Sequence, residues 1–293
     1  MIPVAFDYSA PATVEEALTV LADAGDDGKI LAGGQSLIPV LKLRMAAPSM
    51  VIDLGKIDAL RGVSEDGDAL VIGAMTAHHE VAHDPLVARY AGLIAKATQT
   101  VADPQIRHRG TFGGALVHAD PAGDLPAPAL AMDAEFVIAG PGGTRTVAAA
   151  DFFEDLFTTA VGEDEILTQV RIPKRDGWLS HYEKFTRVAQ QWSIVGVAVT
   201  LRLDGDTIAE ARVALTNMGS VPLRVPAVEQ ALVGCSVAGS ALDDRAIADA
   251  TAGVAEGTNP PSDLNGDADY RRHLAAVLTR KAVVAAALSA GAS

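Results

Sequence analysis

Two diglycine segments, far apart in the sequence, constrain the fold of this chain more than any other feature. "AGGQS" (32–36) follows a short apolar stretch and precedes a helix-like one, and "TFGGA" (111–115) also follows an apolar segment. Glycine has no Cβ, so the main chain can approach a bulky anion, and N–H groups at a helix start can bind phosphate oxygens without a lysine. Either segment alone is more often a simple tight turn. Neither matches G-x-G-x-x-G or a Walker A loop, so the usual dinucleotide-binding and phosphoryl-transfer folds are not supported.

Composition narrows the function classes. The 293 residues are 49% hydrophobic, which is enough for a substantial core, and the formal net charge is −14. A negative far field repels nucleic acid, so we expect no nucleic-acid partner. The chain shows neither a signal peptide nor an apolar run of membrane-spanning length, and we expect a cytoplasmic protein. Cys235 is the single cysteine, which excludes an iron–sulfur cluster, a thiolate zinc site or an internal disulfide. Any redox carrier must be organic or belong to another chain.

A metallopeptidase-like motif, His79-Glu80-Val81-Ala82-His83, occurs between the two diglycines. Such a site requires both histidines on a stable helix and a third ligand from elsewhere. Pro85 disfavours helical geometry at Asp84, so we expect only a short helix, about 76–83. A solvated polar helix face is therefore the favoured interpretation, and no metal ligand is assigned.

Apolar periodicity predicts a mixture of helices and strands. We expect helices at 12–24 (with Thr13 as N-cap), 36–44 (with Ser36 as N-cap), 85–100, 226–233, 243–255 and 269–288. We expect strands at 4–11, 29–34, 50–54, 69–76, 134–140, 144–149 and 165–172, and a strand pair, 192–203 and 207–218, about an Asp-Gly turn. The segment 64–68 reads as a turn, 101–126 as an irregular loop and 173–177 as a linker between domains.

Three separated motifs together carry a family resemblance. "ILAGGQSLIPVLKLRMAAPSMVIDLGKI", "PQIRHRGTFGGALVHADPAGDLPA" and "EKFTRVAQQWSIVGVAV" resemble the FAD-binding medium subunits of molybdenum hydroxylases, and among these most of all the aerobic carbon monoxide dehydrogenases. The likeness spans nearly the whole chain, and the motifs keep the family's order. It implies an α+β fold, in which two α/β subdomains (1–57 and 58–176) clamp an extended FAD and a C-terminal domain (177–293) combines an antiparallel sheet with helices.

The resemblance also implies the cofactor-binding residues. Ala32, Gly33, Gly34, Gln35 and Ser36 would surround the pyrophosphate, and Thr111, Gly113, Gly114 and Ala115 would line the flavin and its linker. Asp124, Leu167, Lys184 and Trp192 would contact FAD, the last two near the flavin ring. On sequence alone, Asp124 could equally be a cap or turn residue, Leu167 and Trp192 core residues, and Lys184 a solvent-facing strand residue.

Some nearby residues receive no cofactor role, and others depart from the family pattern. We favour a structural role for Arg107 and Arg109, and assign no proton chemistry to His118 and Asp120; the chain has no predicted catalytic residue. Relatives commonly have Asn or Ser at Ala115, Asn at His108 and an acidic residue at Gln191. Ala115 would forgo a hydrogen bond of about 0.5–1.5 kcal/mol, so the flavin contact would be weaker or rearranged.

The expected function is that of an FAD-carrying electron-transfer subunit. The resemblance implies a large subunit with molybdopterin cytosine dinucleotide, a small subunit with two [2Fe–2S] clusters, and a dimer of heterotrimers that delivers electrons to a quinone or other acceptor. Peripheral association with the inner face of the membrane is left open. Carbon monoxide is the first substrate hypothesis. The alternatives are a xanthine, N-heterocycle or aldehyde hydroxylase, a self-contained FAD oxidase or reductase, and a flavin-free scaffold subunit.

Overall fold

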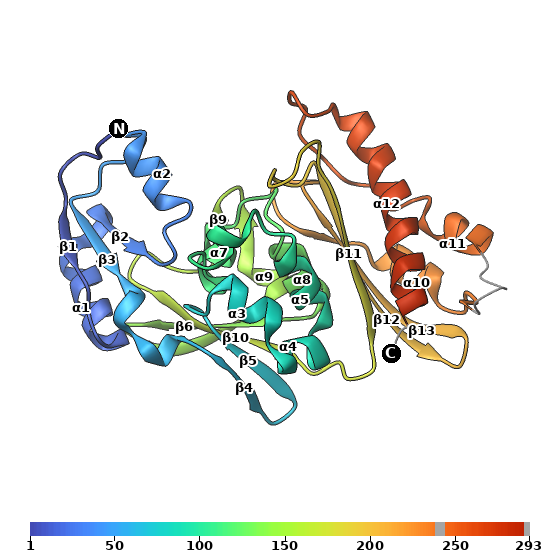
Figure 1. Cartoon of the computed structure of the whole chain (residues 1–293), viewed down its shortest axis with the longest axis horizontal. Coiled ribbons are helices and arrows are strands. Elements are labelled where there is room, and N and C mark those ends of the chain that lie inside the picture. The colour runs from blue at the N-terminus through green and yellow to red at the C-terminus, as the bar shows by residue number, and fades with distance from the viewer. Residues whose placement is uncertain (238–243, 290–293) are drawn as a thin grey trace.

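The computed structural model describes residues 1–237 and 244–289, and its three larger sheets follow one another along the longest axis of the molecule (Figure 1). The N-terminus lies beside the first sheet, and the last helix packs on the third (Figure 1). The predicted α+β class is confirmed. In the described part of the chain, no helix combines the length and apolar character needed to cross a membrane.

The first sheet is small and parallel, with strand order β1-β3-β2. Its elements are β1 (Asp7–Ser9), α1 (Val14–Ala24), β2 (Gly28–Leu31), α2 (Leu37–Lys42) and β3 (Met50–Asp53). Thr13 caps α1 as predicted, because its hydroxyl accepts from the Glu16 N–H. Ser36 is the N-cap residue of α2 as predicted, although its side chain makes no capping hydrogen bond.

The second sheet is antiparallel, with order β4-β5-β10-β6-β7. Its strands are β4 (Val63–Asp66), β5 (Ala69–Gly73), β6 (Glu135–Gly140), β7 (Gly143–Ala148) and β10 (Ile166–Pro173). A separate hairpin pairs β8 (Phe153–Asp155) with β9 (Thr158–Thr159). The predicted turn 64–68 is shorter than expected, because β4 extends through Asp66 and pairs with β5.

Seven short helices accompany this second sheet in the described chain. They are α3 (His78–His83), α4 (Pro85–Tyr90), α5 (Gly92–Gln99), α6 (Pro104–Arg107), α7 (Phe112–His118), α8 (Pro126–Ala131) and α9 (Ala149–Phe152). The predicted single helix 85–100 is wrong: Ala91 is non-helical, and the Tyr90 carbonyl accepts from the Arg175 N–H. The predicted irregular loop 101–126 is also wrong in part, because Asp103 and Thr111 cap α6 and α7 inside it.

The third sheet has two covered faces. It contains β11 (Leu179–Phe185), β12 (Val195–Asp204), β13 (Thr207–Thr216) and β14 (Leu223–Arg224), all antiparallel. Helix α12 (Ala268–Leu288) lies on one face, and α5 and α8 lie on the other (Figure 1). Along β12, Val197 and Val199 join the core under α12, whereas the smaller Ala198 joins the core of the second sheet. The period-2 alternation of strand side chains therefore serves two cores at once.

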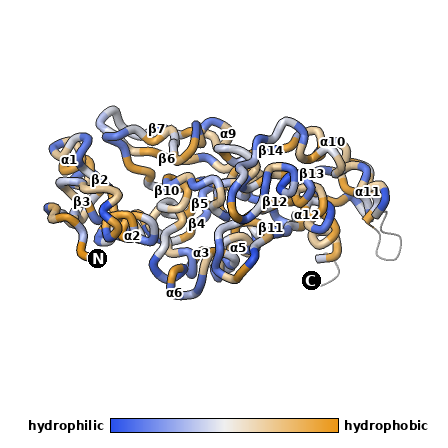
Figure 2. Tube along the Cα trace, turned by 90° about the horizontal axis from the view of Figure 1, so that it is seen from above, coloured by the Kyte–Doolittle hydropathy of each residue, from blue (hydrophilic) through white to orange (hydrophobic). Residues whose placement is uncertain are grey.

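Two further helices complete the C-terminal part. Helix α10 (Pro226–Leu232) and helix α11 (Asp244–Thr251) pack near β13 and α12. The predicted start of the middle helix at residue 243 lies outside the described residues, and α11 ends earlier than the predicted 255. Figure 2 shows that hydrophilic and hydrophobic residues are interspersed along α10, α11 and α12.

Asp133 joins the second and third sheets. Its carboxylate forms ion pairs with Arg175, which follows β10, and with Arg224 on β14, and lies 3.6 Å from the Arg212 guanidinium on β13. Asp133 has a φ of 54°, a left-handed conformation that Asp and Asn tolerate better than most residues. One carboxylate therefore compensates several partly buried guanidinium groups at the junction.

Asp133→Asn should lower the stability of the folded chain, because it removes the negative charge while keeping a residue suited to the left-handed backbone. We expect a loss of about 1–3 kcal/mol, less than the 3–5 kcal/mol for a fully buried pair because solvent screens this site. Urea unfolding followed by circular dichroism measures it, with the exposed Asp23→Asn as the matched control. Equal unfolding midpoints for the two variants would contradict this assignment of Asp133.

Gly113 packs directly on the end of β5. A Cβ added to it would lie 2.5 Å from the Ala74 Cβ and 2.7 Å from the Ala74 Cα, and its N–H donates to the Ala74 carbonyl oxygen. Gly113→Ala should therefore destabilise the chain by about 1–3 kcal/mol through overpacking, although alanine by itself favours a helix by about 1 kcal/mol. Thermal unfolding tests this. Gly142→Ala is the control, because a Cβ there meets nothing within 4 Å; a Gly113→Ala variant as stable as this control would refute the packing argument.

Candidate functional site

A cleft of about 640 Å³ is lined by residues from each of the three parts of the chain that form the larger sheets. This volume lies in the range of small-molecule and cofactor sites. Every residue that the sequence analysis assigned to the cofactor lines it: Ala32, Gly33, Gly34, Gln35, Ser36, Thr111, Gly113, Gly114, Ala115, Asp124, Leu167, Lys184 and Trp192. The two diglycine segments therefore face one cavity.

The first diglycine segment presents free backbone donors. The N–H groups of Gly33, Gly34, Gln35 and Ser36 have no hydrogen-bond acceptor among the described residues. Gly34 has a φ of 74°, which glycine adopts without strain, and the Gln35 side-chain amide donates to the Gly33 carbonyl oxygen. Backbone donors inside proteins are normally paired, so four consecutive unpaired N–H groups beside a cleft suit an anion.

The glycines also have a role that the sequence did not reveal. A Cβ on Gly33 would lie 2.3 Å from the Arg109 carbonyl oxygen and 2.6 Å from the Gly110 Cα. Gly33 therefore lets the two segments touch backbone to backbone. In the second segment, the Thr111 hydroxyl accepts from the Gly114 N–H, and a Cβ on Gly114 would lie 2.6 Å from that same oxygen. Close packing of the protein on itself accounts for glycine at these positions even before a ligand is considered.

A buried polar network forms another wall of the cleft. The Lys184 ammonium lies 2.6 Å from the Asp124 carboxylate and donates to the Thr100 carbonyl oxygen. The other Asp124 oxygen accepts from the Tyr182 and Ser193 hydroxyls. The side chains of Lys184 and Asp124 are only 10% and 5% exposed, so a solvent-facing Lys184 and a simple turn role for Asp124 are excluded. Burial raises the pKa of Asp124, and the Lys184 ammonium opposes that rise.

Leu167 and Trp192 differ sharply in exposure. Leu167 is 4% exposed and belongs to the core of the second sheet, as one interpretation expected. It also lines the cleft, and its contact with FAD stays a prediction. Trp192 is 54% exposed, and a core-packing role for it is therefore wrong. A large exposed indole at the edge of a cleft is available to pack against a planar ligand.

His78 is a cleft residue that the sequence analysis missed. Its side chain is buried, and its Nδ1 atom has no hydrogen-bond partner. Burial, assisted by the positive charge of Arg107, lowers the pKa of His78 to about 4. His78 directly precedes the His79–His83 motif and is not part of it. A lone buried histidine has no sequence pattern of its own, so no signal identified it.

The side chains of the metallopeptidase-like motif are engaged in other contacts. The Glu80 carboxylate accepts from the Ala77 N–H at the start of α3, and the His83 ring contacts the His79 carbonyl oxygen. The His79 ring stacks on His108 with centroids 3.9 Å apart. Across residues 1–237 and 244–289, no three His, Cys, Asp or Glu side chains are arranged to hold a metal ion.

The remaining residues considered from sequence also have defined positions. The Arg107 guanidinium donates to the Val101 carbonyl oxygen, which is a structural contact. His118 and Asp120 line the cleft, where the His118 ring packs against Phe157 and Asp120 accepts from the Ala122 N–H. The Gln191 side chain bonds the Arg187 N–H and Asn265, so glutamine at this position has its own hydrogen-bond partners.

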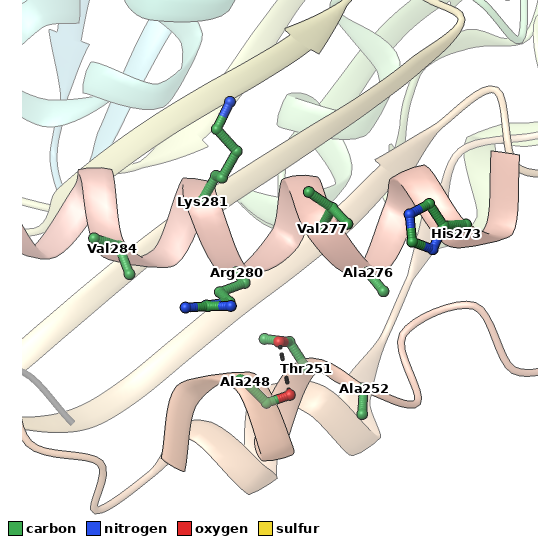
Figure 3. A pocket seen from close by; sticks show the side chains of 9 residues that line it. All are labelled: Ala248, Thr251, Ala252, His273, Ala276, Val277, Arg280, Lys281 and Val284. Carbon is green, nitrogen blue, oxygen red and sulfur yellow. Dashed lines mark hydrogen bonds between the residues drawn. The ribbon is translucent and has the colours of Figure 1, made fainter. Parts of the chain in front are cut away.

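A second hollow, of about 690 Å³, lies between α11 and α12 (Figure 3). Ala248 of α11 and Ala252, which follows α11, line it together with His273, Val277 and Arg280 of α12 (Figure 3). None of the residues expected at the cofactor lines it, and it lacks a glycine-rich backbone. The cleft between the diglycine segments is therefore the candidate cofactor site.

Comparison with known proteins agrees with this geometry. Residues 4–175 match the family model described as the FAD binding domain in molybdopterin dehydrogenase, and residues 180–286 match the CO dehydrogenase flavoprotein C-terminal domain. The carbon monoxide dehydrogenase medium chain of Hydrogenophaga pseudoflava is 41% identical over 98% of each chain. The glyceraldehyde dehydrogenase medium chain of Sulfolobus acidocaldarius is 36% identical, over 96% of this chain and 98% of that one.

A solved structure is similar over the same extent. The reconstituted CO dehydrogenase from Oligotropha carboxidovorans contains a chain that superimposes with a TM-score of 0.93 at 37% identity, covering 98% of this chain and 99% of that one. Family models span most of the sequence, and the relatives match it from end to end. The chain belongs to the family of FAD-binding medium subunits of the molybdenum hydroxylases.

Proposed function

We propose that this chain is the FAD-carrying electron-transfer subunit of a molybdenum hydroxylase complex. The observation that carries the proposal is the convergence of two distant diglycine segments on one cleft, where four consecutive backbone N–H groups of 33–36 have no acceptor among the described residues. Uncharged backbone donors can bind a diphosphate on a chain whose net charge is −14. Membership of the family makes the chain an oxidoreductase subunit.

The lining residues divide into groups suited to different parts of FAD. The free donors of Gly33, Gly34, Gln35 and Ser36, next to Ala32, would hold the diphosphate. Thr111, Gly113, Gly114 and Ala115 would line the flavin and its linker. Leu167 offers an apolar wall, and Trp192 offers an exposed aromatic plane. The Asp124–Lys184 pair offers a fixed polar wall. The absence of a side-chain amide or hydroxyl at Ala115 leaves flavin recognition to its neighbours.

Bound FAD would supply the redox chemistry, and the chain would supply binding, orientation and electrostatic surroundings. We assign no catalytic acid or base to the protein. Because Cys235 is its single cysteine, iron–sulfur clusters would belong to a partner. The proposed route therefore runs from a large molybdenum subunit, through two [2Fe–2S] clusters of a small subunit, to this chain and then to a quinone or another acceptor. A dimer of heterotrimers, with peripheral contact at the inner face of the membrane, completes the proposed assembly.

Carbon monoxide is the proposed substrate of the complex. Support comes from the similarity to carbon monoxide dehydrogenase medium chains. Medium chains named for glyceraldehyde dehydrogenase and nicotine 6-hydroxylase are 36% and 38% identical, so an aldehyde or N-heterocycle is the second candidate. Substrate selection in the proposed complex would reside in the large subunit.

The full chain should bind FAD much more tightly than riboflavin, because riboflavin lacks the diphosphate that the free N–H groups suit. Several charge-assisted hydrogen bonds, each worth about 1.5–3 kcal/mol, predict at least a hundredfold difference in Kd. Quenching of flavin fluorescence measures both affinities. Equal affinities would refute the diphosphate cradle, and a native assembly purified intact without any flavin would favour the scaffold alternative.

The native assembly, purified through a tag on this chain, should contain large and small partner subunits and reduce a dye when given carbon monoxide. The chain alone, loaded with FAD, should not oxidise carbon monoxide, because it has neither molybdenum ligands nor cluster cysteines among its assigned residues. Activity only toward an N-heterocycle or aldehyde would overturn the carbon monoxide assignment. Substrate turnover by the chain without partners would support the self-contained oxidase instead.

A further inference from the structure

His78 is a buried polar side chain that has no partner in the protein. It is 4% exposed, its Nδ1 atom lacks a hydrogen-bond partner, and its side chain makes no hydrogen bond to any described residue. Leaving a buried polar group unpaired costs about 1–3 kcal/mol, so such groups call for an explanation. The imidazole lines the same cleft as the diglycine segments.

The ring lies where the two diglycine segments meet. The His78 N–H donates to the Gly110 carbonyl oxygen, and Ala77 forms a β-bridge with Thr111. A Cβ on Gly110 would lie 2.8 Å from the His78 ring, while a Cβ on Gly33 would lie 2.6 Å from the Gly110 Cα. Gly110 is therefore in close contact with both Gly33 and the imidazole, and the imidazole lines the same cleft as residues 33–36.

Among the described residues that line the cleft, no cation is uncompensated. Its charged lining residues are Asp120, Asp124, Glu165 and Lys184, and Lys184 is neutralised by Asp124. Glu165 pairs with Arg145, outside the cleft lining. A diphosphate that entered would therefore meet backbone dipoles and excess negative charge. A group able to gain a positive charge on binding would offset that disadvantage.

The surroundings of His78 favour its neutral form until an anion arrives. Burial lowers its pKa to about 4, and the Arg107 guanidinium on α6 acts in the same direction. On its own helix, Glu80 bonds the Ala77 N–H, and His79 and His83 contact each other. On α5, which packs against α3, the Lys96 ammonium donates to the Ser180 carbonyl oxygen. A diphosphate beside the ring would reverse the balance and raise its proton affinity.

We propose that His78 binds the diphosphate of FAD at the junction of the two glycine segments, and that it takes up one proton as the cofactor binds. This inference rests on the proposed function and adds a binding residue and a pH dependence to it. In the loaded site, the protonated ring donates to a phosphate oxygen, and the proton comes from solvent. The affinity for FAD then increases as the pH falls through the pKa of the bound form toward the lower pKa of the free chain.

The experiment measures the Kd of the full chain for FAD between pH 5.5 and 8 by fluorescence quenching, and proton uptake by calorimetry in two buffers of different ionisation enthalpy. The unmodified chain should bind FAD more tightly at lower pH, with a slope of up to about tenfold per unit, and take up as much as one proton. His78→Gln keeps a hydrogen-bonding side chain but cannot titrate. It should bind FAD about tenfold more weakly at low pH and show neither the slope nor the uptake.

Two further histidine variants make the test specific. His79→Gln changes the exposed neighbour that does not line the cleft, and should behave like the unmodified chain. His118→Gln changes the other histidine in the cleft, and should keep the pH slope. A slope that survives in His78→Gln, or that disappears in His118→Gln, would overturn the role of His78 while leaving FAD binding intact. If no variant, nor the unmodified chain, binds FAD at any pH, the proposed function itself fails.

Discussion

The contact between Gly33 and the backbone of 109–111 is the constraint on which the rest of the site depends. A Cβ at Gly33 would lie within 2.9 Å of three main-chain atoms there, so any other residue would push the two segments apart. Gly33 belongs to the part of the chain that forms the first sheet, and 109–111 to the part that forms the second. Their contact therefore sets the distance between these two sheets. The core of the first sheet reinforces it, since Met75 and Ile166 from the second part pack there with Ile52. Main-chain packing of this kind leaves the N–H groups of 33–36 at a cavity edge instead of in a closed turn.

Polar contacts, in addition to the apolar packing of Ala198 and Ala214, attach the third sheet to the same cavity. Tyr182, Lys184 and Ser193 all converge on Asp124, a residue of the second part. Such a buried pair is a weak source of net stability, because desolvation offsets most of its attraction, but its geometry is demanding. Asp133 provides a second polar junction on the same interface. Two directional clusters thus fix how the C-terminal sheet meets the cleft wall that carries Trp192.

Sequence patterns predicted most of the longer strands, whereas the expected cofactor residues, all of which line the cleft, came from the family resemblance. The patterns failed where structure depends on local capping. The stretches 134–140, 165–172, 192–203 and 207–218 contain strands, as their apolar patterns predicted. The helices within 101–126 were not predicted because α6 and α7 are only four and seven residues long and begin at the Asp103 and Thr111 caps. The break at Ala91 depends on a hydrogen bond from distant Arg175, which no local pattern carries. His78 was not predicted as a cleft residue for a similar reason, because its burial depends on contact with Gly110, which is distant in the sequence.

An acidic chain that binds a dianionic cofactor needs positive electrostatic potential at the cofactor site. A permanently charged side chain there would attract the chain's own carboxylates, so other donors have to supply it. In this cleft, Lys184 is already paired with Asp124, and outside its lining Arg107 on α6 donates to the Val101 carbonyl oxygen. Neutral donors remain: the main-chain N–H groups freed by glycine geometry, and one imidazole whose charge depends on the ligand. Each such donor, if buried and unpaired, costs about 1–3 kcal/mol in the unliganded protein, which is less than a buried unpaired ion would cost. Their interaction with an anion is stronger than with a neutral group. The same N–H groups and imidazole would therefore both bind the diphosphate and compensate its charge.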